Sequence, residues 1–298
     1  MKTFGLLLLV TGLTAAACSH AAPQSPPPVL GQVPTITAVD EVKRPLDRYL
    51  LSVDQVKTLI RAEGVATAQC MKGYGLRSLS PDLDEVDREA GYIMTRNRLY
   101  GYFDTQDGAY PGYETLGQQD LNGFETLSAD QTTALSGRDA SGKPAVALNG
   151  KLLPPGGCDQ IGLDAIGGIP PRLDEKTLPD GGPQVPVSDP RLVSVYALWS
   201  SCMRGKGYSY TTPVAALGDP QWNPGPNADP KTYQPSVLEK ATVAADVECK
   251  RTTNLVGTAV AVQSAYDEQY IASHSAALAD YRRKVDADLA AANRILAR

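Results

Sequence analysis

The sequence predicts a mainly α-helical protein with two disulfide-stapled helical halves, a long C-terminal helix and at most a small β-hairpin. One motif occurs twice, as CMKGYGL at 70–76 and CMRGKGY at 202–208, and each copy ends an amphipathic helical segment. Four cysteines follow the first eighteen residues, which is enough for two disulfide bonds. The stretch 255–295 contains no proline and is rich in alanine and charged residues, as expected of a long helix.

The first residues resemble the signal sequence of a bacterial lipoprotein. A lysine gives a positive start, and the apolar run 4–13 is too short to span a bilayer but suits a signal-peptide core. Small residues then precede Cys18, as in a lipobox. Residues 1–17 are therefore the predicted signal peptide, and Cys18 is the predicted lipidation site. Ala15 stands where the lipobox most often has leucine, which leaves open an ordinary cleavage and secretion into the medium.

The cysteine count supports lipidation. An odd number of cysteines leaves an exported protein with one unpaired thiol, and this chain has five: Cys18, Cys70, Cys158, Cys202 and Cys249. If Cys18 is lipidated, four remain for disulfide bonds in an oxidising compartment. Residues 18–45 begin with a stretch rich in proline, serine and alanine, and they are predicted to form an extended, lipid-anchored tether.

The first helical half is predicted to span 46–168. Ser52 and Gln55 have the spacing of a capping box, which predicts a helix from this point to Cys70 with the cysteine on its buried side. Gly73 is then predicted to end this helix in a left-handed conformation.

A hairpin and a linker follow. Segment 146–153, VALNGKLL, predicts a hairpin, because Asn149-Gly150 suits a type I′ turn between short apolar arms. Residues 169–188 are rich in proline and glycine and are predicted to link the two halves.

The second half is predicted to span 189–298. Asp189 and Pro190 suit the N-cap and the first position of a helix that carries Cys202 near its end, where Gly205 is the predicted C-cap.

Two further helices are predicted after this one. Ser236 and Glu239 have capping-box spacing, which predicts a helix through Cys249. The last helix needs a surface to pack on, because a helix gains little stability from propensity alone. Its own two halves are the favoured surface, and a second copy is the alternative. The predicted apolar seam comprises Val262, Tyr266, Tyr270, Tyr281, Val285, Leu289 and Leu296.

Four cysteines allow three pairings. We favour Cys70–Cys158 with Cys202–Cys249, because each bond then stays within its own half and joins a helix-end cysteine to the next cysteine along the chain.

These landmarks resemble a family of exported actinobacterial proteins and lipoproteins over residues 44–270. The matching stretches are the paired CM-x-G-x-G motifs with RPLDRYLLS, RLYGYFDTQDGAYPGY, ALNG…PPGGC, DPRLVSVYALWSS and VAADVECKRTTNLVG. The resemblance implies an address in the cell envelope and a framework of two cysteine pairs. It implies no catalytic residues.

The remaining motifs do not favour catalysis or a cofactor. The cysteines occur singly rather than in CxxC pairs, which argues against zinc or copper. Segment 137–143, GRDASGK, has P-loop spacing, but Pro144 stands where a serine or threonine must bind magnesium. The two histidines, His20 and His274, accompany no nucleophile motif. No catalytic residue, metal, nucleotide or other cofactor is predicted.

Acidic residues leave one enzymatic alternative. Segment 80–89, SPDLDEVDRE, carries five of them. A glycosidase needs two carboxylates about 5–10 Å apart across a cleft, which neighbours in one run rarely provide. We interpret the run as a polar turn or the start of a helix.

The aromatic residues offer a weak candidate for ligand binding. Stacking platforms for a sugar are possible at Tyr100, Tyr102, Tyr110, Tyr113 and Trp222. The alternative is that these side chains close the surface of a modest core, which tyrosine does well because its hydroxyl can reach water.

We therefore expect a lipid-anchored protein on the extracytoplasmic face of the cell membrane, acting as a non-catalytic interaction or structural module. The net charge of −5 excludes a nucleic-acid footprint. A module that binds a cell-wall saccharide or small ligand is the second hypothesis, and a carbohydrate-active hydrolase is the third. The expected partners are the membrane, through the anchor, and an envelope protein or glycan.

Overall fold

The computed structural model describes residues 26–77, 100–104, 112–113, 127–168, 176–179, 182–223 and 234–298. In these residues the fold is mainly helical, with one two-stranded antiparallel sheet and two disulfide bonds, which confirms the predicted fold class. The helices are α1 (Val53–Gly73), α4 (Ala129–Ser136), α5 (Gly157–Ala165), α6 (Pro190–Gly205), α7 (Pro213–Leu217), α8 (Val237–Thr252), α9 (Leu255–Ser273) and α10 (Ser275–Leu296).

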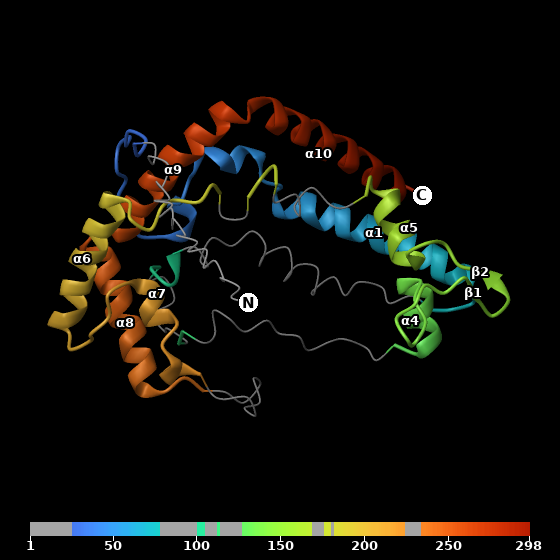
Figure 1. The fold of residues 1–298 in the computed structure, drawn as a ribbon, viewed down its shortest axis with the longest axis horizontal. Helices are drawn as coiled ribbons and strands as arrows, with labels where there is room; N and C mark the ends of the chain where they lie inside the picture. The colour runs from blue at the N-terminus through green and yellow to red at the C-terminus, as the bar shows by residue number, and fades with distance from the viewer. Residues whose placement is uncertain are drawn as a thin grey trace, which may run out of the picture.

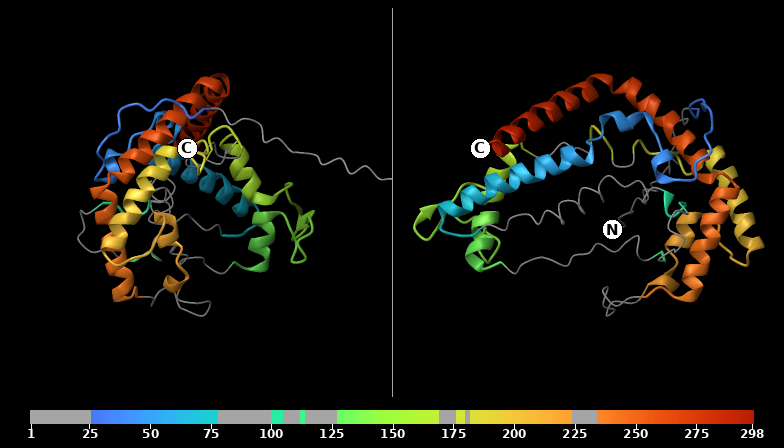
Figure 2. Two further views of the ribbon diagram at one scale, coloured as in Figure 1. Left: turned by 60° about the vertical axis from the view of Figure 1, so that its left-hand side comes forward. Right: turned by 180° about the vertical axis from the view of Figure 1, so that it is seen from behind.

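The helices form an arch (Figure 1). Helices α6, α7 and α8 make one end with the start of α9, while α1, α4 and α5 make the other (Figure 2). Helix α10 runs alongside α1, so the last helix of the chain packs on the first half rather than on the half that precedes it in sequence.

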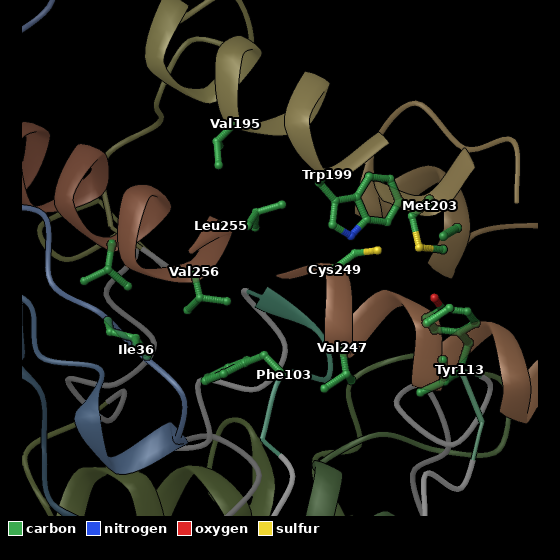
Figure 3. Close-up of a cluster of buried hydrophobic side chains, with 14 of the residues drawn as sticks. Ile36, Phe103, Tyr113, Val195, Trp199, Met203, Val247, Cys249, Leu255 and Val256 are labelled. Carbon is green, nitrogen blue, oxygen red and sulfur yellow. The ribbon is translucent and has the colours of Figure 1, made fainter. Parts of the chain in front are cut away.

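Each end of the arch has its own hydrophobic core. The α6–α9 core, drawn in Figure 3, is centred on Trp199, Met203, Val243, Cys249 and Val256. The α1–α10 core contains Val56, Leu59, Leu278, Tyr281 and Val285. A smaller cluster joins the end of α1 to α4 and α5. The C-terminal helices bury their apolar side chains inside this chain, as predicted.

Both copies of the repeated motif form the same helix ending. The N–H of Gly75 donates to the carbonyl of Lys72, and the N–H of Leu76 donates to that of Met71. Gly207 and Tyr208 make the equivalent bonds in α6. These pairs define a Schellman cap, whose left-handed residue is here the second glycine of the motif.

The prediction that Gly73 and Gly205 adopt the left-handed conformation is therefore wrong. Both glycines are the last residues of their helices, and Gly75 and Gly207 have the positive φ angles of 75° and 91°. Each motif contains two glycines, and the left-handed C′ position falls on the second because the helix continues through the first.

The disulfides pair Cys70 with Cys158 and Cys202 with Cys249, as favoured above, and the Cα atoms are 5.6 Å apart in each. Closing loops of this length contributes about 4 kcal/mol per bond. Cys70 and Cys202 are half-buried, whereas their partners Cys158 and Cys249 are fully buried. The most buried residues of the two motifs are instead Met71 and Met203.

Several local predictions are confirmed. Ser52 and Gln55 form a capping box, and the Asp189 and Ser236 side chains accept bonds from the first turns of α6 and α8. The strands β1 (Ala147–Leu148) and β2 (Lys151–Leu152) form the hairpin. Its turn residues, Asn149 and Gly150, have φ angles of 50° and 78°, as a type I′ turn requires.

The predicted tether boundary at residue 45 is too late. Ile36 and Val42 lie in the α6–α9 core. Upstream of them, the carbonyl of Pro28 accepts a bond of 2.6 Å from Arg191 Nη1, and that of Pro34 accepts one of 2.8 Å from Asn254 Nδ2. The proline-rich start of 18–45 predicts an extended tether, but the apolar residues Ile36 and Val42 near its end pack into the core.

The long C-terminal helix is interrupted once, between α9 and α10. Ser273 Oγ donates to the carbonyl of Tyr270, and His274 Nδ1 lies 3.0 Å from the same oxygen. Such local side-chain bonds compete with the helical ladder. The predicted apolar seam of these two helices is buried only in part. Val262, Tyr281 and Val285 are buried, whereas Leu296 is exposed.

The packing of α10 on α1 yields a test with a matched control. Leu278→Ala removes a fully buried side chain, while Leu296→Ala changes a residue that is 41% exposed on the same helix. We expect Leu278→Ala to lower the free energy of unfolding by about 2–5 kcal/mol and Leu296→Ala to change it little. Denaturant unfolding measures both. Equal effects, or a change in oligomeric state on light scattering, would contradict the packing.

Candidate functional site

A small pocket lies where α6, α7, α8 and α9 meet. Its volume is about 180 Å³, and residues of all four helices line it together with Arg44, Tyr100 and Tyr113. The helices supply Leu192 and Tyr196 from α6, Leu217 from α7, Lys250 from α8 and Gln263 from α9. The pocket thus adjoins the α6–α9 core and is built by segments that are distant in sequence.

A buried carboxylate organises one end of the pocket. Asp246 is fully buried in α8 and accepts three hydrogen bonds. Its Oδ2 atom accepts from the Tyr113 hydroxyl at 3.0 Å and from Lys250 Nζ at 2.8 Å, and its Oδ1 atom accepts from the Trp199 indole at 3.0 Å. These bonds tie Tyr113 to α6 and α8.

The electrostatics of this cluster favour donors that stay protonated. Burial and the Asp246 charge raise the pKa of the Tyr113 phenol far above its usual range. Burial also raises the pKa of the Asp246 carboxyl, whereas Lys250, Tyr113 and Trp199 act in the opposite direction because they donate to its ionised form. With three donors on one carboxylate, the arrangement suits an ion pair with Lys250 rather than a general base.

A second buried ion pair lies at the other end. Arg44 donates from Nε to Asp267 Oδ2 at 3.0 Å and from Nη2 to Asp267 Oδ1 at 2.8 Å. The two side chains are 4% and 0% exposed. Gly182 packs so closely on this pair that an added Cβ would lie 2.1 Å from Arg44 Nη2, and its φ of 92° also favours glycine.

Both cations retain unused donors. Arg44 Nη1 has no acceptor within the described part of the chain. Lys250 Nζ donates to Asp246 and, at 3.0 Å, to the carbonyl of Tyr102, which leaves one N–H. Arg44 and Lys250 line the pocket together with the Asp246 carboxylate, whereas Asp267 does not. Two cationic side chains and one carboxylate, already paired with Lys250, therefore line a cavity whose other walls are largely apolar.

The predicted aromatic residues are only partly in this site. Tyr100 is half-buried and lines the pocket. Tyr113 also lines it and donates its hydroxyl to Asp246. Tyr102 is half-buried against the α6–α9 core and contributes its carbonyl to Lys250. Trp222 is buried with its indole bonded to the carbonyl of Ala216, so its ring packs on Tyr113 rather than facing a ligand.

Other predicted features lie elsewhere. Cys18, Tyr110 and the acidic run 80–89 are outside the described residues. Segment 137–143 forms a tight turn in which Asp139 accepts bonds from Ser141, and the hairpin rather than a helix follows it. All four cysteines of the described chain are in disulfides and carry no thiolate for a metal. No described helix is long and apolar enough to cross a membrane.

Sequence reasoning missed Asp246, Lys250, Arg44 and Asp267. Asp246 and Lys250 are four residues apart on a helix, a spacing that normally marks a surface pair. The sequence does offer one signal. Val243, Val247 and Cys249 lie in the same short segment, which indicates that much of this helix is buried. Arg44 and Asp267 are too far apart in sequence to be paired by inspection.

The chain matches no family model, no curated protein and no solved structure. The geometry of the pocket is accordingly the basis of the functional proposal.

The Asp246–Lys250 pair can be tested by a double-mutant cycle. Asp246→Asn leaves the Lys250 ammonium buried without a counter-charge, which should lower the free energy of unfolding by about 3–5 kcal/mol. Lys250→Met should have a similar effect because it strands the carboxylate. The double variant should lose clearly less than the sum of the two. Additive losses measured by denaturant unfolding would show that the two groups are not coupled.

Proposed function

We propose that the protein is a lipid-anchored, non-catalytic module of the extracytoplasmic membrane face that binds a small ligand in this pocket. The observation that carries the proposal is the pair of buried cations, Arg44 and Lys250, which both line this cavity and each keep an N–H that no described acceptor takes. The lipobox-like sequence before Cys18 supports the anchor.

The unused donors define the ligand class. Guanidinium and ammonium N–H groups bind acceptor oxygens, and charge-assisted bonds to a carboxylate are the strongest of these. Apart from Asp246, which is neutralised by Lys250, and Gln263, the remaining walls are mostly aromatic and aliphatic. A cavity of about 150 Å³ holds one benzene molecule, so a pocket of about 180 Å³ suits one ring or a short chain. The ligand we propose is a small acid with an apolar body.

A binding role agrees with the chemistry of the lining groups. The Asp246 carboxylate is saturated by three donors, and the raised pKa of Tyr113 keeps its proton in place. Neither group is poised to accept a proton from a substrate. Cell-wall saccharide, the second hypothesis, finds less support because Trp222 is buried outside the pocket and Tyr113, which lines it with Tyr100, is buried and bonded to Asp246.

The ligand class can be tested with benzoate and its neutral counterpart benzamide. We expect benzoate to raise the melting temperature of the protein at pH 7 and benzamide to have little effect, because only the acid provides an ionic acceptor. A ligand at 100 times its dissociation constant stabilises by about 2.7 kcal/mol. Glucose and N-acetylglucosamine test the saccharide hypothesis in the same assay.

A variant pair locates the effect. Ala259→Phe places a ring in the pocket and should abolish the response to benzoate, while Ala272→Phe, at an exposed position of the same helix, should keep it. A response to benzamide as large as that to benzoate, or one that survives Ala259→Phe, would exclude an acid-binding pocket.

The anchor has its own test. Cys18→Ala removes the thiol that would carry the lipid, so the variant should move from the membrane fraction to the medium or accumulate as an unprocessed precursor. Cell fractionation with immunoblotting measures this. A variant that is processed and stays in the membrane like the parent would show that Cys18 is not the anchor.

A further inference from the structure

Helix α6 has an outward face unlike that of the other long helices. No charged residue occurs between Arg191 and Arg204. Val193 and Leu198 point outward and are 51% and 60% exposed, with Ser194, Ala197 and Ser201 also exposed. By contrast, α10 presents Asp280, Arg283 and Asp286 to solvent. Both figures place α6 on the outer end of the arch.

The N-terminal segment is fixed at the start of this helix. Arg191 Nη1 donates to the carbonyl of Pro28 at 2.6 Å, while its Nε and Nη2 atoms donate to Asp189 at 2.8 and 2.6 Å. The Tyr266 hydroxyl donates to Asp189 as well. Hydrogen bonding to Arg191 holds the pKa of Asp189 at about 2, so this junction is ionised at neutral pH.

The length of chain between Cys18 and Pro28 limits how far the α6 end can lie from a membrane that holds Cys18. Ten peptide units separate Cys18 from Pro28, and a fully extended chain covers about 3.3–3.6 Å per residue, or roughly 35 Å. Helices α9 and α10 are each roughly 30 Å long at 1.5 Å per residue, and they lead from the α6 end of the arch toward the hairpin end (Figure 1). A lipid on Cys18 therefore keeps the α6 end near the bilayer, while the hairpin end can lie well away from it.

We propose that the outer face of α6 rests on the membrane surface, with Val193 and Leu198 in the interface between headgroups and acyl chains. This rests on the lipid anchor proposed above. Helices that lie on a membrane place apolar residues at this depth and basic residues beside the headgroups. Arg204, exposed near the end of α6, fits the second requirement, and Lys206 just beyond the helix is exposed but pairs with Glu248 at 2.7 Å. Exposed valines also flank the start of the helix, at Val187 and Val29.

An environment-sensitive fluorophore tests the contact. In the lipidated protein purified from membranes, all other cysteines are in disulfides or carry lipid, so NBD can be attached to Leu198→Cys alone. The matched position is Val146→Cys, which is 73% exposed beside the hairpin at the other end of the arch. On vesicles of phosphatidylglycerol and phosphatidylcholine, emission from residue 198 should shift to shorter wavelength and gain intensity, and emission from residue 146 should not change.

A second preparation separates this surface from the anchor. Here a hexahistidine segment replaces Cys18 and holds the labelled protein on vesicles that contain a nickel-chelating lipid. An emission shift at residue 198 in this form supports membrane contact by α6, whether or not Cys18 carries a lipid. If mass spectrometry then finds no lipid on Cys18 of the parent protein, only the anchor proposal fails. No shift at 198 in either preparation, or equal shifts at 198 and 146, overturns the proposal. A shift at 198 without vesicles, in a protein that elutes as a dimer, assigns the face to a second copy and overturns it as well.

Discussion

The fold depends on one helical run that belongs to both hydrophobic cores. Leu255, Val256 and Val260 of α9 are buried with α6 and α8, whereas Ile271 of the same helix and Leu278 of α10 are buried with α1. Neither half of the chain has a complete core without this run. The two disulfides stabilise each end locally, but the relative position of the ends is set by α9, α10 and the short interruption at His274.

The Arg44–Asp267 ion pair lies at the point where the two cores meet. Arg44 stands between Val42, which is in the α6–α9 core, and Leu46, which is in the α1–α10 core, and Asp267 lies between the two apolar stretches of α9. A buried pair contributes modest net stability but costs several kcal/mol when one partner is removed. Its physical role here is therefore to specify how the N-terminal segment sits against α9.

Local signals in the sequence predicted local structure well. The capping box at Ser52, the cap at Asp189 and the turn at Asn149-Gly150 each involve residues within four positions of one another, and all are present. The pairing of cysteines followed from their distribution between two halves. The pocket was beyond reach because its chemistry joins Arg44 to α9 and Tyr113 to α8, contacts that only the tertiary fold defines. The packed segment from 34 to 45 was missed for the same reason.

The position of the pocket has a consequence for how a ligand binds. Arg44 and Lys250 are already held by Asp267 and Asp246, so both side chains are positioned before a ligand arrives. A preformed site of this kind loses little conformational entropy on binding. Since Arg44 is also part of the segment that leads toward Cys18, a ligand on its Nη1 atom adds one more contact between that segment and the helices. Binding is thus expected to reinforce the docked N-terminal segment rather than to displace it.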